Sequence, residues 1–105
     1  MSEYVAPLRD MRFVMQELAG LDQIVSLPGC EEASADVVDA ILDEAAKFAG
    51  EVISPLNRVG DTDGAKWKET VVTTSPGFKE AYRQFVDNGW NGLGCDPEFG
   101  GQGLP

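Results

Sequence analysis

The fold of this chain is decided by the stretch SADVVDAILDEAAKFAGEVISP, which covers residues 34–55. Its apolar residues recur every three or four positions and most of its charged residues fall on the opposite side, as in an amphipathic helix. Ser34 is a favourable N-cap, Asp36 complements the helix dipole, and Pro55 limits or kinks the helix near its end. The pattern therefore predicts a helix over 35–54. The core stripe of this helix comprises Val37, Val38, Ile41, Leu42, Ala45, Phe48, Ala49, Val52 and Ile53.

Further helices are predicted on both sides of this stretch. Apolar residues at helical spacing after a first-turn proline predict a helix over 7–19, and residues 21–25 can add a short turn. Ser75 followed by proline starts a third helix over 76–88, which Gly89 closes. The aromatic residues at helical spacing are expected in the core rather than on a stacking surface for a flat cofactor. This aromatic set is Phe78, Tyr82, Phe85, Trp90 and Phe99.

The segment 56–74 shows no helical period and is rich in turn-forming residues. Within it, residues 71–74 favour a β-strand but have no evident partner, so an ordered loop is predicted. No linker or internal repeat divides the chain. The expected fold class is therefore all-α, a single helical domain over 1–105 with about three main helices and irregular connectors.

The charge of the chain restricts its partners. Eight Lys and Arg residues against 18 Asp and Glu residues give a formal net charge of −10. Nucleic-acid backbones and anionic membranes would repel such a chain. No apolar run approaches the ~18 residues that a membrane span requires, and the first four residues lack the basic character of a targeting segment. We therefore expect no nucleic-acid partner, no membrane span and a cytoplasmic location.

The residue types present do not form a recognisable catalytic or metal site. The chain has no histidine, which excludes Ser-His and Cys-His nucleophile pairs, and Cys30 and Cys95 are expected to be free thiols. Asp61 begins a stretch that resembles a calcium loop, but Thr70 stands where the bidentate glutamate would be needed. The neighbouring acids Glu31 and Glu32 are read as complements of a helix dipole. No catalytic, cofactor-binding or metal-binding residue is assigned within the chain.

The glycine-rich tail GWNGLGCDPEFGGQGLP covers residues 89–105. Clustered glycines can present backbone N–H groups to a phosphate when they join a strand to a helix. This tail instead follows a helix, and its spacing fails the Gly-x-Gly-x-x-Gly pattern. A tight connector is the favoured interpretation.

Several short segments, taken in order, resemble the acyl-CoA dehydrogenase family over nearly the whole chain. The resemblance is strongest to its bacterial branch similar to 3-methylmercaptopropionyl-CoA dehydrogenases. Each segment is weak alone, but their shared order makes the resemblance specific. The segments are YVAPLRDMRF (4–13), AAKFA (45–49), VISPLNRVGD (52–61), GFKEAYR (77–83), GWNGL (89–93) and EFGGQGLP (98–105).

The resemblance implies an enzyme that oxidises an acyl-CoA thioester to the 2,3-enoyl-CoA. In the family a hydride passes to FAD, a glutamate removes the α-proton, and an electron-transfer partner reoxidises the flavin. The implied architecture has a helical N-terminal domain, a middle β domain and a C-terminal four-helix bundle. The family's glutamate and most of its FAD contacts lie in the latter two domains, which are expected to be absent here. The 105-residue chain alone is therefore expected to be inactive and to hold no cofactor.

The tail residues are the only ones to which the resemblance gives a place near a site. Gly100, Gly101, Gly103 and Leu104 would lead into a helix that borders the acyl-chain pocket. A glycine-rich connector at the end of the sequence favours an N-terminal fragment of a dehydrogenase, and a standalone helical interaction or scaffold module is the alternative. Apolar residues left uncovered by the missing domains should make the chain self-associate as a symmetric dimer, tighter at higher salt.

Overall fold

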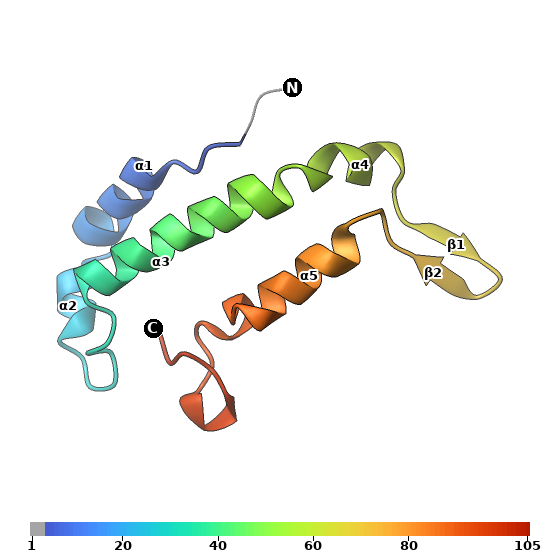
Figure 1. Cartoon of the computed structure of the whole chain (residues 1–105). Coiled ribbons are helices and arrows are strands. Elements are labelled where there is room, and N and C mark those ends of the chain that lie inside the picture. Colours follow the sequence, from blue (N-terminus) through green and yellow to red (C-terminus); the bar gives the residue numbers. More distant parts are fainter. Residues whose placement is uncertain (1–3) are drawn as a thin grey trace.

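The computed structural model describes residues 4–105 and is mostly helical, so the predicted all-α class is confirmed (Figure 1). The prediction that the first four residues form no targeting segment includes residues 1–3, which lie outside the described residues. None of the helices in residues 4–105 is both long and apolar enough to cross a bilayer. In chain order the elements are α1 (Leu8–Phe13) with a π-helical turn (Val14–Leu18), α2 (Leu21–Val25), α3 (Ala35–Phe48) with a π-helical turn (Ala49–Ile53), α4 (Leu56–Thr62), β1 (Lys66–Lys68), β2 (Val71–Thr73) and α5 (Phe78–Asp87), followed by 3-10 turns at Trp90–Gly92 and Pro97–Phe99.

The long helix α3 forms as its sequence predicts. The backbone N–H of Val37 donates to the Ser34 hydroxyl over 3.4 Å, which confirms Ser34 as the N-cap. The π-helical turn carries the helix on to Ile53, and Pro55 ends it there. The helix predicted over 7–19 is confirmed as α1 with its own π-helical turn, and α2 is the expected short turn.

Helix α5 confirms the third predicted helix, but its start differs from the prediction. It begins at Phe78, and its N-cap is Gly77 with φ +86°. Ser75 is buried, and its backbone carbonyl accepts a hydrogen bond of 3.2 Å from the Phe78 N–H. A Cβ on Gly77 would lie 2.7 Å from a methyl group of Leu56, so glycine is required both by the backbone conformation and by this close approach.

The loop predicted over 56–74 is wrong. Residues 56–62 form α4, because Gly60 lets the ring of Phe78 approach so closely that a Cβ there would lie 2.7 Å from it. This tertiary contact outweighs the poor helix propensity of the segment. The β-favouring residues do have a partner: β1 and β2 pair antiparallel, with Trp67 opposite Val72 (Figure 1).

The turn of this hairpin explains why the sequence concealed it. Glu69 and Thr70 both have positive φ, 50° and 68°. Two-residue hairpin turns with positive φ at both positions are dominated by Asn-Gly and related pairs, and a β-branched residue there is strained. The pair Glu69-Thr70 is therefore not recognised as a hairpin turn from the sequence.

Helices α1 and α5 lie on different flanks of α3 (Figure 1). On one flank Arg12 of α1 binds Asp39 and Asp43 of α3. On the other, the ring of Phe48 lies 6.3 Å from those of Phe85 and Trp90, centroid to centroid. An ion pair thus holds one neighbour of α3, and aromatic packing holds the other.

The core is much smaller than the stripe on α3 predicted. The residues below one tenth exposure are Leu21, Ala33, Leu42, Ser75 and Ala81. Of the predicted stripe only Leu42 is buried, and Ile53 is 46% exposed. The expectation of core positions also fails for Phe78, Tyr82 and Phe99, which are 40%, 67% and 83% exposed.

The overall dimensions agree with this thin core. The radius of gyration is 17.2 Å, whereas a compact chain of this length has about 13 Å. The accessible surface is 8010 Å², against roughly 5,700 Å² for a folded monomer of this mass. The elements are well formed, but they do not close around one another.

We expect replacement of Glu69-Thr70 by Asn-Gly to stabilise the hairpin by about 1–2 kcal/mol, because it removes the strain of two side chains at positive φ. Amide hydrogen exchange at Lys68 and Val71 measures this. The control Glu69→Gln removes the charge without relaxing the backbone and should change little. Faster exchange in the Asn-Gly variant would contradict the turn geometry.

Leu42→Ala should lower the free energy of unfolding by about 2 kcal/mol, near the low end for buried leucines, since so thin a core can collapse around the gap. Ile41→Ala, at a half-buried position one residue away, should cost about 1 kcal/mol. Urea denaturation of the two variants compares them. Equal losses would show that Leu42 is not the centre of the packing.

Candidate functional site

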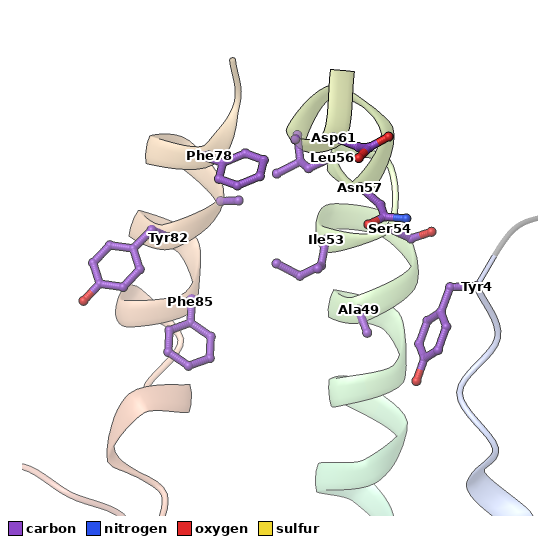
Figure 2. Close-up of a pocket in the computed structure, with 12 residues that line it drawn as sticks. Tyr4, Ala49, Ile53, Ser54, Leu56, Asn57, Asp61, Phe78, Tyr82 and Phe85 are labelled. Carbon is purple, nitrogen blue, oxygen red and sulfur yellow. The ribbon is translucent and has the colours of Figure 1, made fainter. Parts of the chain in front are cut away.

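A groove with a volume of about 930 Å³ lies between α3–α4 and α5 (Figure 2). Most of its lining is apolar, and Asp61 is the one charged side chain among the described residues that line it. The lining residues are Tyr4, Ala49, Ile53, Ser54, Leu56, Asn57, Gly60, Asp61, Phe78, Ala81, Tyr82 and Phe85.

The two walls of this groove are built differently. Figure 2 shows Ile53 and Leu56 on the α5 side of their helices, whereas Asn57 and Asp61 lie on the side of Tyr4. The π-helical turn that carries Ile53 widens the helix where it lines the groove, and such turns are frequent at functional sites. The wall facing α5 is thus apolar, and the polar groups lie around the back of α4.

Helix α5 supplies the opposite wall. Phe78 and Phe85 are directed toward α3–α4, and Tyr82 points away from them (Figure 2). Between them Ala81 is buried, because a small side chain lets α5 approach its neighbours. The aromatic stripe that the sequence indicated is therefore a groove wall rather than a closed core.

A second hollow of about 680 Å³ lies between α3 and the tail. Apolar side chains from both elements line it, including Phe48, Trp90 and Leu104. Lys47 also lines it, but its ammonium already binds Glu44 over 2.6 Å, and this hydrogen bond raises the pKa of Lys47. This cation is therefore already partnered by a carboxylate.

The glycine-rich tail folds back on itself, and its amides are occupied. Five successive N–H groups, from residue 100 to residue 104, donate to backbone carbonyls of Pro97, Asp96, Gly92, Cys95 and Leu93 respectively. These bonds are 2.9 to 3.1 Å long. None of these amides is free to receive a phosphate, which supports the interpretation of the tail as a tight connector.

The four tail residues placed near a pocket by resemblance have separate roles in this fold. Gly100 and Gly103 take positive φ, +86° and +67°, which suits glycine. A Cβ on Gly101 would overlap the carbonyl group of Cys95, so no side chain fits there. Leu104 lines the second hollow. The residues that the resemblance singled out therefore shape the tail, and one of them reaches a hollow.

The other candidate groups of the sequence do not come together. Asp61 lies in α4 and not in a calcium loop, and Glu31 accepts a hydrogen bond from the N–H of Gly29. Both cysteines are free thiols, as predicted. Within residues 4–105 no three His, Cys, Asp or Glu side chains are placed to hold a metal ion.

The strongest electrostatic feature joins α1 to α3. Arg12 Nε donates to Asp39 Oδ1 over 2.9 Å, and Nη2 donates to Asp43 Oδ1 over 2.7 Å. These hydrogen bonds, first to Asp39 and then to Asp43, raise the pKa of Arg12 above its ordinary value. The guanidinium is therefore charged at every working pH, and it serves to fix α1 rather than to line a hollow.

No protein-family model matches the chain. It is 42% identical over 102 residues to the 3-methylmercaptopropionyl-CoA dehydrogenase of Ruegeria pomeroyi, a match that covers 97% of the chain and 17% of that protein. It is 28% identical over 100 residues to the butyryl-CoA dehydrogenase of Syntrophomonas wolfei, covering 91% of the chain and 16% of that protein. The resemblance to acyl-CoA dehydrogenases is thus confirmed over nearly the whole chain, which spans about a sixth of the length of these relatives.

Gly101→Ala should release the tail, because its methyl group cannot coexist with the Cys95 carbonyl; we expect a loss of about 1–3 kcal/mol in local stability. Amide hydrogen exchange at Gln102 and Gly103 should accelerate accordingly. Gly92→Ala is the matched control, since a Cβ there meets its nearest atom at an ordinary 3.6 Å. Similar exchange in both variants would contradict the folded-back tail.

Proposed function

We propose that this chain, related in sequence to acyl-CoA dehydrogenases over nearly its whole length, is a helical N-terminal part of such an enzyme. The enzyme would use FAD to oxidise an acyl-CoA thioester to the 2,3-enoyl-CoA in the cytoplasm and pass electrons to a separate acceptor. The role of this chain would be to shape and cover the site. Catalysis itself would depend on residues elsewhere in the enzyme.

The observation that carries this proposal is the open surface of the chain. Its accessible area exceeds that of a compact monomer of the same mass by about 2,300 Å². Large apolar side chains on both α3 and α5 contribute to that surface. Faces of this kind are expected where a helical layer packs against further domains.

The residues of the chain do not by themselves fit a flavin. A dinucleotide needs N–H donors or cations for its pyrophosphate and an enclosed site for its ring. The larger groove offers Asp61, whose charge has the same sign as a phosphate, and the amides of the tail already donate to carbonyls. We therefore assign no redox step to this chain.

Near the substrate, the proposal gives the tail a positioning role. Gly100, Gly101, Gly103 and Leu104 would set the path of the chain into the helix that borders the acyl pocket. Their tight turn supports this, because positive φ at two positions and the close contact at Gly101 leave that path little freedom.

A standalone interaction module is the second candidate. It is favoured by the well-formed elements, among them α3 with its N-cap and a fully paired hairpin. Such a module would use the same apolar faces to bind a partner protein. The two candidates differ in whether the chain can complete a flavoprotein.

We expect the purified chain to show no flavin absorbance after gel filtration from excess FAD and no oxidation of acyl-CoA, since an open groove without phosphate donors cannot enclose the cofactor. Retained flavin would contradict the assignment of the site to other parts of the enzyme.

The positive test replaces the matching 102 residues of the Ruegeria enzyme by this chain, and the chimera should purify with flavin and keep measurable activity. The same chimera carrying Gly101→Ala is its control and should lose activity. A well-folded chimera without flavin would favour the interaction module.

A further inference from the structure

The β1–β2 hairpin stands away from the rest of the chain (Figure 1). All six of its strand residues are exposed, and Trp67 is 72% exposed. Because Trp67 pairs with Val72, the two side chains share one face of the hairpin. A tryptophan and a valine thus form an apolar face that nothing in the described chain covers.

The hairpin also lacks the internal support to stand alone. Its turn holds Glu69 and Thr70 at positive φ, and isolated two-stranded hairpins are at best marginally stable in water. A surface that covers Trp67 and Val72 would supply the missing stabilisation. The hairpin therefore has the properties of a segment that is held by a partner.

The groove between α3–α4 and α5 matches this face in size and character. Its volume of about 930 Å³ is at the upper end of the range for ligand pockets, so an indole with a valine beside it can enter. Its walls offer Ile53, Leu56 and Phe85. The chain therefore carries both an exposed apolar face on the hairpin and an open apolar groove that could receive it.

The charged side chains near the two surfaces stay outside such a contact. Lys66 and Lys68 lie on the face of the hairpin opposite Trp67, in a chain with eight basic residues in all. The charged residue that lines the groove is Asp61. When Trp67 enters the groove, both lysines therefore point away from it and remain in water, and Asp61 lies around the back of α4, so the contact buries no charge.

A chain cannot easily fill its own groove in this way. The hairpin is joined to α4, one wall of the groove, by three residues, Asp63 to Ala65, and it projects away from that wall (Figure 1). A second copy is free of this constraint. In a two-fold arrangement each hairpin enters the groove of the other copy, so the interface closes.

The available area is sufficient for such an interface. The surface in excess of a compact monomer is about 2,300 Å², and a standard interface takes about 800 Å² from each partner. We propose that this chain forms a two-fold dimer in which the β1–β2 hairpin of each copy occupies the groove between α3–α4 and α5 of the other. This proposal does not depend on the proposed function, and the flavin experiments above can fail without affecting it.

Sedimentation equilibrium of the full chain over a range of concentrations tests the dimer. Trp67→Ala should weaken dimerisation at least about tenfold, as expected for a buried aromatic anchor. Phe99→Ala is the matched control, because Phe99 is even more exposed than Trp67 but lines neither hollow, and it should leave the dissociation constant unchanged. Raised ionic strength should tighten the dimer by screening the repulsion between two chains of charge −10. A monomer at every concentration, or a dimer sensitive to Phe99→Ala and indifferent to Trp67→Ala, would overturn the proposal.

Mixing two variants tests the exchange itself. Ile53→Asp damages the groove and Trp67→Ala damages the hairpin, so each variant alone loses both contacts of its dimer. The mixture can restore one intact contact, since the hairpin of the first variant fits the groove of the second. We expect a mixed dimer tighter than either variant dimer, and its absence would exclude the exchange. Circular dichroism should show unchanged helix in both variants, because both positions are exposed.

Discussion

The structure depends on the width of one apolar stripe. Along α3 and its π-helical turn, apolar residues occupy more of the helix circumference than one neighbouring helix can cover. Helix α1 takes one flank and α5 takes another, and Leu42 is the one stripe residue that becomes buried. Both hollows lie along the part of this stripe that the neighbouring helices leave uncovered.

The two neighbours of α3 are held by different kinds of interaction. Arg12 holds α1 through two carboxylates of α3, a partly exposed ion pair whose contribution to stability is modest. Aromatic rings hold α5, and they also form a groove wall. Since neither interface is large, the chain has well-defined local structure but a thin core. Such a layer is suited to packing against something else, whether the remainder of a dehydrogenase or a second copy.

Several glycines of this chain are required because other atoms pack closely against them, not because they bind a nucleotide. Gly60 and Gly77 admit Phe78 and Leu56 respectively, and Gly101 admits a backbone carbonyl. The same tail that in composition suggests a phosphate loop has its amides donating to its own carbonyls. A high glycine content indicates that the backbone comes close to another group. The hydrogen bonds show that this group is a backbone carbonyl of the tail itself.

The sequence by itself determined the all-α class, the three main helices and the N-cap at Ser34, because helical periodicity and caps are local properties. It also carried the resemblance to acyl-CoA dehydrogenases. Only the tertiary structure decided that residues 56–62 are helical and that 66–73 form a hairpin, since one depends on Phe78 packing against Gly60 and the other on a Glu-Thr turn of unusual conformation. The groove was equally invisible, because periodicity shows that Phe78 and Phe85 share a helix face but not whether another element covers that face. Burial depends on what lies opposite in space, and no local pattern contains that information.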